Sequence, residues 1–306
     1  MPTASRSLSP PRSLHTFSWF ILIAANGAWA TSYVAAKFAL QETSVTMMLA
    51  LRMSISALIL LPFLIIKRKA LHLHVKDLPQ LLLLSLVGFV INKLFEFGGL
   101  ALTTASDVAL LITAESIFTA ALSWLVLHER CRRQTVFALG LGFVGVYLIV
   151  EQSVIPTIPV GGGVWRIIGD LLVILALLIE AFYTVRGKAL LVKHSPLLIT
   201  SASIVGSTLF WVPVAGWEMY TTGWHMPGLL TLISIGWLAL VCTVFAYLAW
   251  FQGLTRITGS AAASTLFIQP LLGTLLAIVL LHDHLTPATV CGGLLIIVSV
   301  YFISKQ

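Results

Sequence analysis

Long apolar runs separated by short polar segments are the feature that most limits what this chain can fold into. Of its 306 residues, 58% are hydrophobic and only 9% are charged, whereas an ordinary soluble domain carries about 25% charged residues. So few charges cannot cover the water-exposed surface of a chain this long. A soluble globular fold is therefore excluded, and we expect lipid to surround most of the protein.

Ten apolar segments each have about the 20 residues that an α-helix needs to cross a bilayer. They lie near residues 17–39, 45–66, 77–99, 104–127, 133–151, 165–187, 195–215, 227–250, 258–281 and 286–304. The loops between them are too short to hold a soluble domain. The sequence therefore predicts an all-α integral membrane protein with ten transmembrane helices.

The basic residues orient these helices. All but four of the 18 lysines and arginines fall in segments that are cytoplasmic if the N-terminus is inside. Of the other four, Arg166 is external, and Lys37, Arg52 and Lys93 lie within spans. The positive-inside rule then predicts a multi-pass protein of the cell (inner or plasma) membrane with both termini in the cytoplasm. The net charge of +7 reflects this topology, and we expect no nucleic-acid partner.

The chain also aligns with itself at a nearly constant offset. An offset of 151 residues pairs Lys37 with Lys188, Ser44 with Ser195 and Pro62 with Pro213. An offset of 154 pairs Gly99-Leu100 with Gly253-Leu254, and His128-Glu129 with His282-Asp283. Ordered matches that include polar residues indicate an internal repeat, and a three-residue insertion between the two blocks explains the change of offset.

The repeat divides the chain into two halves of five spans. We expect a cytoplasmic tail at 1–16, a first repeat at 17–151, an external linker rich in Pro and Gly at 152–164, and a second repeat at 165–306. Because five is odd, the second half must enter the membrane from the opposite side. Two inverted five-helix repeats are an architecture of secondary transporters, with the binding site near the midplane.

Several motifs resemble one family. Ala28-Trp29-Ala30-Thr31-Ser32-Tyr33 with Lys37 resembles the first-helix signature of the EamA-type transporters of the drug/metabolite transporter superfamily, with Ala30 where Gly is usual. Leu51-Arg52-Met53 resembles their second-helix Arg motif, and 99–149 and 280–299 resemble the ends of their two repeats, with Ser116 in place of a common Pro. The resemblance implies a central cavity formed by spans 1, 3, 4, 6, 8 and 9, and transport of amino acids, nucleosides, drugs or other metabolites.

One stripe of the first span carries polar and aromatic residues. Asn26, Trp29, Tyr33 and Lys37 follow helical spacing, so they share a face. Such a face is costly in lipid, which favours a position lining the cavity for the first three. The alternative is helix–helix packing, with Lys37 reaching the interface by snorkelling or pairing.

Two carboxylates lie near the middle of spans. Glu115 and Glu180 have no basic neighbour within one turn of their own helices. They should therefore be neutral, or be ready to bind a proton or a cationic group of a substrate. The alternative is a protonated carboxyl hydrogen-bonded to a neighbouring helix. Gln269 stands at the position of Glu115 in the other half, which suggests that only one half titrates.

Other intramembrane charges are expected to pair. Lys93 and Glu96 are i, i+3 neighbours that can neutralise each other, and Arg52 is expected to pair with an acidic residue or with helix-end carbonyls. Asp107 fits the first turn of a helix. Taken together, the expected substrate-binding residues are Asn26, Trp29, Tyr33, Glu96, Glu115, Glu180, Tyr183, Tyr247, Trp250 and Gln269, with Glu115 and Glu180 as candidates for coupling.

The sequence thus predicts a secondary transporter that exports small organic metabolites by alternating access, with possible proton coupling. A facilitator of the same solutes is the first alternative, and a polytopic membrane enzyme is the second. We expect no catalytic residues, no metal site and no cofactor, because the usual metal, prenyl-diphosphate and nucleotide motifs are missing. The partners expected are a small-molecule substrate and the lipid bilayer. Gly140, Gly142 and Gly145 allow close helix packing, either inside the molecule or in a homodimer.

Overall fold

In the computed structural model, the described residues are 12–66, 75–102, 105–127, 133–151, 164–223, 225–281 and 287–304. They form helices and short connections, with no strand in these ranges. The first half contains α1 (Arg12–Ala30), α2 (Ser32–Ala39), α3 (Val45–Ile66), η1 (Val75–Asp77), α4 (Leu78–Leu84), η2 (Ser85–Ile91), α5 (Asn92–Leu102), α6 (Ala105–Leu127) and α7 (Arg133–Glu151). The second half contains α8 (Val164–Leu190), α9 (Pro196–Thr222), α10 (Leu229–Ala239), η3 (Leu240–Phe245), α11 (Ala246–Leu254), α12 (Gly259–Ala263), η4 (Ser264–Phe267), α13 (Ile268–Leu281) and α14 (Pro287–Ser304).

Six helical segments are long and apolar enough to cross a membrane. They are Thr16–Ala39, Val45–Ile66, Leu78–Leu102, Ile168–Leu190, Pro196–Thr222 and Leu229–Leu254. Two shorter apolar helices, Ala114–Leu127 and Val290–Ser299, lie within two of the other expected spans. The expected first span is interrupted at Thr31, and the ninth begins as α12 and a 3₁₀ turn. The expected linker at 152–164 lies almost entirely outside the described residues.

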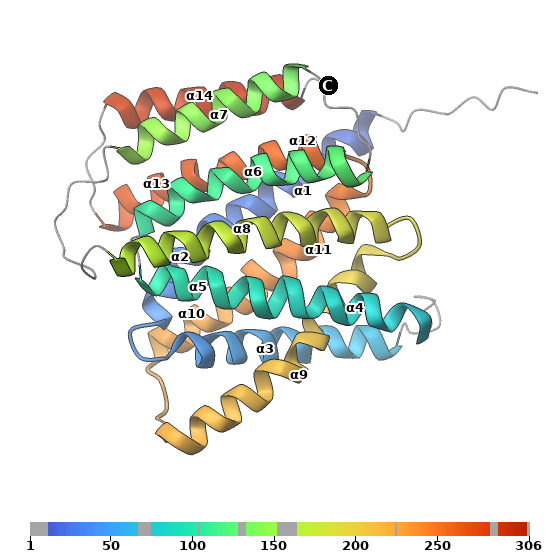
Figure 1. The fold of residues 1–306 in the computed structure, drawn as a ribbon, viewed down its shortest axis with the longest axis vertical. Coiled ribbons are helices and arrows are strands. Elements are labelled where there is room, and N and C mark those ends of the chain that lie inside the picture. Colours follow the sequence, from blue (N-terminus) through green and yellow to red (C-terminus); the bar gives the residue numbers. More distant parts are fainter. Residues whose placement is uncertain are drawn as a thin grey trace, which may run out of the picture.

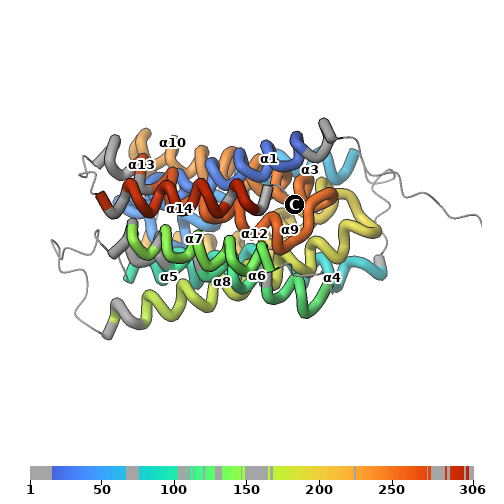
Figure 2. The backbone as a smooth tube through the Cα atoms, turned by 90° about the horizontal axis from the view of Figure 1, so that it is seen from above, coloured from blue at the N-terminus to red at the C-terminus, as the bar shows by residue number. Residues whose placement is uncertain are grey.

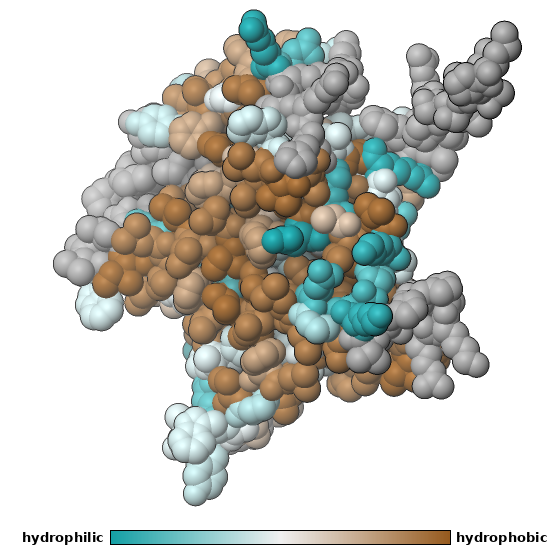
Figure 3. Space-filling view, turned by 45° about the vertical axis from the view of Figure 1, so that its right-hand side comes forward, coloured by the Kyte–Doolittle hydropathy of each residue, from teal (hydrophilic) through white to brown (hydrophobic). Residues whose placement is uncertain are grey.

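The long helices run side by side in a stack (Figure 1). Seen from above, they still run along one direction (Figure 2). Their outward faces are apolar: Ile66, Leu209 and Leu229 are 80%, 66% and 75% exposed. Figure 3 shows apolar side chains over most of the surface on one face of the molecule. Such a surface suits contact with lipid, because lipid replaces the water that apolar side chains would otherwise meet.

Residues that the sequence pairs as equivalents also play equivalent structural roles. The hydroxyl of Ser44 accepts a hydrogen bond from the N–H of Met47, and that of Ser195 accepts one from Leu198, so each serine caps the start of its helix. Pro62 and Pro213 each lie inside the capped helix. The three-residue insertion inferred from the changed offset lies in one segment of each half: α4 and η2 together have 14 residues, whereas α10 and η3 together have 17.

The helix pairs repeat in the same way. Helix α5 packs on α8, and its counterpart α11 packs on α1. In both pairs the contact is made through a glycine: a Cβ on Gly99 would lie 2.7 Å from Val173, and a Cβ on Gly253 would lie 2.5 Å from Leu22. The two contacts are related by the internal repeat, so a common scaffold underlies the two halves.

Within the described residues, each half contains a π-helical segment, η2 in the first half and η3 in the second. A π-turn leaves backbone carbonyls without their usual helical partners. The indole N–H of Trp211 donates to the carbonyl of Phe89 in η2 at 2.8 Å, and that of Trp29 donates to the carbonyl of Cys242 in η3 at 2.9 Å. Trp211, which is buried, and Trp29, which is partly buried, therefore hydrogen-bond to the backbone of the π-helical segments and join the two halves.

Two of the three glycines of α7 pack closely against other helical segments of the same chain. A Cβ on Gly145 would lie 2.7 Å from the carbonyl oxygen of Gly292 in α14, and one on Gly142 would lie 2.8 Å from the ring of Phe267. A Cβ on Gly140 would meet nothing within 4 Å. Of the two uses expected for these glycines, the structure therefore assigns Gly142 and Gly145 to packing within the chain.

We predict that Gly99→Ala destabilises the protein by about 1–3 kcal/mol, because its methyl group would overlap the backbone carbonyl of Gly169 at 2.7 Å. Gly98→Ala is the matched control, since a Cβ there meets nothing within 4 Å. The measurement is the Tm of the purified protein in detergent. Equal Tm values for the two variants would contradict the close approach of α5 and α8.

Candidate functional site

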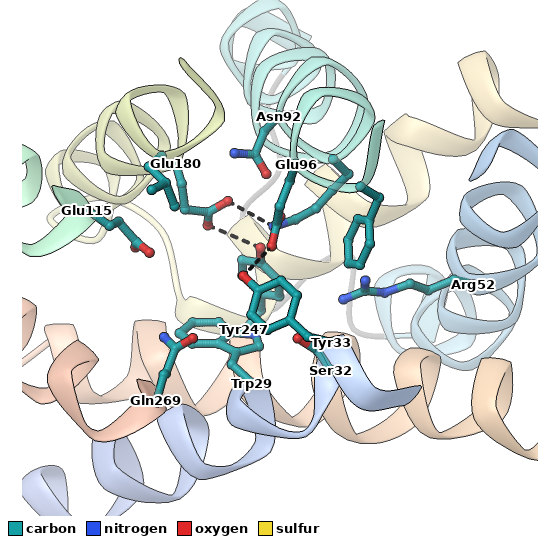
Figure 4. A pocket seen from close by; sticks show the side chains of 13 residues that line it. Trp29, Ser32, Tyr33, Arg52, Asn92, Glu96, Glu115, Glu180, Tyr247 and Gln269 are labelled. Carbon is teal, nitrogen blue, oxygen red and sulfur yellow. Dashed lines mark hydrogen bonds and ion pairs between the residues drawn. The ribbon is translucent and has the colours of Figure 1, made fainter. Parts of the chain in front are cut away.

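A cavity of about 460 Å³, including the space at its mouth, lies where the two halves meet. Most of that space lies at the mouth. The enclosed part measures about 30 Å³, room for one or two water molecules, so the cavity must widen before it can hold a larger solute. Its walls are formed by Trp29, Ser32, Tyr33, Arg52, Asn92, Lys93, Glu96, Phe97, Glu115, Leu177, Glu180, Tyr247 and Gln269. These residues come from α1, α2, α3, α5, α6, α8, α11 and α13, so both repeats contribute to the site (Figure 4).

Lys93 forms the centre of a buried ion-pair network. Its Nζ donates to Glu96 Oε2 at 2.6 Å and to Glu180 Oε2 at 3.2 Å. The remaining carboxylate oxygens accept hydrogen bonds from two tyrosines, Tyr33 to Glu96 at 2.9 Å and Tyr247 to Glu180 at 3.1 Å. Because Glu96 belongs to the first half and Glu180 to the second, the network connects the two repeats across the cavity (Figure 4).

One expectation about these charges needs correction, and another is confirmed. Glu180 was expected to lack a basic partner, but Lys93 on the neighbouring helix α5 provides one. Local sequence spacing misses this partner, because it lies 87 positions away. The Lys93–Glu96 pair is confirmed at 2.6 Å. It is not an isolated pair, because the same ammonium group also lies 3.2 Å from Glu180 Oε2.

Arg52 differs from its expected role as well. Its Nε donates to the hydroxyl of Thr243 at 2.7 Å, and the guanidinium lies 5.4 Å from the centre of the Phe97 ring. No carboxylate among the described residues lies within ion-pair distance of it, so the acidic or carbonyl partner expected for Arg52 is not found in this part of the chain. The side chain is only 2% exposed, and Nη1 is buried without a hydrogen-bond partner.

Glu115 reaches the cavity from α6, on the side away from Arg52 (Figure 4). Within the described part of the chain it makes no hydrogen bond or ion pair. Its counterpart Gln269 also lines the cavity, where its amide donates to Asn26 at 2.9 Å. The amide of Asn26 donates in turn to Thr265. The same position in the two repeats therefore carries a free carboxyl group in one half and a satisfied amide in the other.

Aromatic rings form much of the remaining wall. The ring of Trp29 lies 5.1 Å from that of Tyr247 and 5.5 Å from that of Trp250. Behind them, the ring of Tyr183 packs at 6.0 Å from Tyr247. The ammonium group of Lys93 lies 5.7 Å from the centre of the Tyr247 ring. This wall holds the ionic network in place and offers flat faces to a bound solute.

Most of the expected site residues come together at this cavity. Seven of the ten line it: Trp29, Tyr33, Glu96, Glu115, Glu180, Tyr247 and Gln269. The other three, Asn26, Tyr183 and Trp250, are buried behind the wall and contact residues that line it. Lys37 is exposed, away from the cavity, and the side chain of Asp107 lies outside the described residues.

The sequence did not indicate every lining residue. Arg52 comes from the second span, which was not expected to contribute, and Asn92 donates its amide to the carbonyl of Ala176 in α8 at 2.6 Å. The signal that identified Glu115, a polar group in an apolar run, was present for both residues. For Arg52 the sequence favoured an ion pair or a contact with helix-end carbonyls over a position lining the cavity, and Asn92 was not predicted.

Comparisons with known proteins agree with this architecture. The model of the EamA-like transporter family matches the chain twice, at residues 16–151 and 167–305. A solved crystal structure superposes with a TM-score of 0.75 and covers 94% of this chain and 96% of that one, at 15% sequence identity. At that identity the likeness concerns the fold alone.

Relatives are found in several prokaryotes. An uncharacterized transporter of Archaeoglobus fulgidus is 27% identical over 289 residues, which cover 94% of this chain and 99% of that protein. The transporter YetK of Bacillus subtilis is 25% identical, covering 90% and 85% of the two chains. A probable amino-acid metabolite efflux pump of Salmonella typhimurium is 26% identical, covering 64% and 66%.

We predict that Lys93→Met lowers the free energy of unfolding by roughly 3 kcal/mol or more, because it leaves two buried carboxylates without their cation. Adding Glu180→Gln to this variant should recover part of the loss. Lys37→Met is the control, since Lys37 is exposed. Chemical unfolding in detergent measures the difference. A Lys93→Met protein as stable as the Lys37→Met protein would contradict the network.

Proposed function

The chain belongs to the EamA-like transporter family, and from this premise we propose that it is a secondary transporter that exports small organic metabolites across the cell membrane. The observation that carries the proposal is the cavity between the two repeats, which is lined by five buried charged residues from both halves. Intramembrane charges mark solute and ion pathways in transporters. Amino acids and related compounds, nucleosides and drugs are the solute classes considered.

The proposed topology is ten spans in two inverted repeats, with both termini in the cytoplasm of the inner or plasma membrane. The equivalent serine caps, internal prolines and π-helical segments support the repeat. The loop between α2 and α3 and the loop between α9 and α10 lie at one end of the molecule (Figure 1), as this topology requires. The distribution of Lys and Arg assigns that end to the outside.

Contacts at the two ends of the cavity support alternating access. At the proposed outer end, Glu42 Oε2 accepts hydrogen bonds from the N–H of Gly228 at 2.6 Å and from Thr231 at 2.8 Å. Glu218 accepts hydrogen bonds from the hydroxyls of Ser44 and Thr46. We call this group of contacts between the two halves the outer latch.

The proposed inner end has a related contact. His194 Nε2 lies 3.5 Å from Asp77 Oδ2, again between the two halves. At the offset of 151, Asp77 corresponds to Gly228, and His194 is adjacent to the counterpart of Glu42. We call this contact the inner latch. Two latches related by the repeat are what a carrier needs in order to open one end while the other stays closed.

The outer latch depends on an ionised carboxylate. The hydrogen bond from the N–H of Gly228, and then that from Thr231, lowers the pKa of Glu42. A carboxylate with a lowered pKa stabilises the closed contact above its ordinary pKa, and that contribution is lost as the pH falls through the lowered value. Acidification on the outside is therefore expected to loosen this end of the protein.

Within the cavity, Glu115 and Glu180 remain the proposed coupling residues, with different roles. Glu115 has no partner among the described residues, so a proton or a cationic solute can bind it without breaking a contact. A proton on Glu180 would weaken the ion pair to Lys93 that joins the halves. Protonation and the opening of the cavity would thereby be linked.

A facilitator of the same solutes is the main alternative, because the cavity alone does not require coupling to an ion. A polytopic membrane enzyme is the other. The two differ in their need for a compartment: an enzyme would release product in detergent, whereas a carrier acts only across a sealed membrane.

For transport in proteoliposomes, we predict that Glu115→Gln and Glu180→Gln each abolish the dependence of flux on an imposed pH gradient. The tracer is the compound that most raises the Tm of the wild-type protein in a panel of amino acids, nucleosides and cationic drugs. The Tm of each Gln variant in detergent, compared with that of the wild type, checks that the variants are folded. If both variants keep the pH dependence of the wild type, neither carboxylate couples transport.

A further inference from the structure

Arg52 holds a buried guanidinium group whose hydrogen-bonding capacity is mostly unused. The group has five N–H donors, and the described residues provide one partner, the hydroxyl of Thr243 on Nε. Nη1 is fully buried without a partner, and the residue lines the cavity. An unsatisfied buried donor on a charged group is costly, so a native structure that keeps one needs an explanation.

The neighbouring carboxylates do not provide it. Both oxygens of Glu96 are occupied, one by Tyr33 and the other by Lys93. Both oxygens of Glu180 are likewise occupied, by Tyr247 and Lys93. The ionic network is therefore closed on itself, and Arg52 remains outside it.

Arg52 is nevertheless held rigidly. Thr243 fixes the Nε end, and the Phe97 ring lies 5.4 Å from the guanidinium carbon. In Figure 4 the guanidinium points from α3 into the cavity. A planar guanidinium group whose Nε is held and whose Nη1 has no partner is preorganised to bind the two oxygens of a carboxylate.

A second ionisable group faces the same cavity from the other side. Glu115 has no partner within the described residues and lies across the cavity from Arg52 (Figure 4). The closed network between them already holds one cation and two carboxylates. A solute that brought only an anion would add to this negative charge, and one that brought only a cation would leave Arg52 unsatisfied.

We propose that Arg52 binds the carboxylate of a zwitterionic solute and that Glu115 binds its ammonium group, so that the cavity selects compounds of the amino-acid type. Such a solute has no net charge, and it gives a partner to each of the two unpaired groups. The aromatic wall formed by Trp29 and Tyr247 lies between them and would contact the rest of the solute. This inference rests on the proposed transport function and specifies its substrate class.

The test is binding to the purified protein in detergent. The probes are leucine, methionine, threonine and phenylalanine, each compared with its carboxamide, which lacks the anion, and its N-acetyl derivative, which lacks the cation. At least one free amino acid should raise the Tm and bind at least tenfold more tightly than either of its derivatives. Arg52→Gln should reduce binding of the acid to the level of the amide, and Glu115→Gln should reduce it to the level of the N-acetyl compound.

Thr243→Val separates this role from a purely structural one. It removes the partner of Nε but leaves Nη1 unchanged, so it should lower the Tm while the preference for acid over amide persists. Arg52→Lys, which keeps the charge and loses the fork, should retain part of that preference. The proposal is overturned if no free amino acid binds, if the wild type binds amide and acid equally, or if Arg52→Gln keeps the preference of the wild type.

The same proteins in sealed proteoliposomes distinguish failure of this inference from failure of the proposed function. Counterflow of a nucleoside or a cationic drug, without counterflow of any of the four amino acids, would leave a transporter whose solutes are not zwitterions. Absence of counterflow for every compound tested would contradict transport itself.

Discussion

The double ion pair of Lys93 is the interaction on which the rest of the structure depends. A lysine inside a lipid-embedded bundle is costly unless it is paired, and this one is shared between carboxylates from the two repeats. The helices that carry these groups must therefore stay together around one centre. The tyrosines occupy the remaining carboxylate oxygens, so the network is complete without Arg52 and Glu115. Those two ionisable groups are left facing the cavity.

The two halves share a scaffold but not its chemistry. Serine caps, close glycine contacts and π-helical turns recur at equivalent positions and set the helix arrangement. Inside the cavity, the equivalent positions differ. Lys93 corresponds to Tyr247, and both contact Glu180, while the free carboxyl group of Glu115 corresponds to the amide of Gln269. The repeated helix arrangement therefore gives the molecule two related ends. The residues that differ between the repeats give the one cavity two sides of different chemistry.

The sequence predicted the parts of this structure that follow from local patterns. Apolar runs located the helices, and matches such as Ser44 with Ser195 located the repeat, because caps and spans depend on nearby residues. Polar groups within those runs identified most of the cavity wall. The partner of Glu180 and the isolation of Arg52 were missed, since both depend on how distant helices pack. The π-helical turns were missed as well, because composition does not distinguish them from α-helix.

The central claim is that the cavity opens to one side at a time, and electron–electron spin distances test it most directly. One label pair, Gln41 with Leu229, reports on the outer latch; the pair at the related positions, Leu78 with Val192, reports on the inner end. All four residues are exposed. Glu42→Gln, which weakens the outer latch, should lengthen the outer distance while the inner distance stays short. If both distances lengthen together, or neither changes, alternating access between these latches is contradicted.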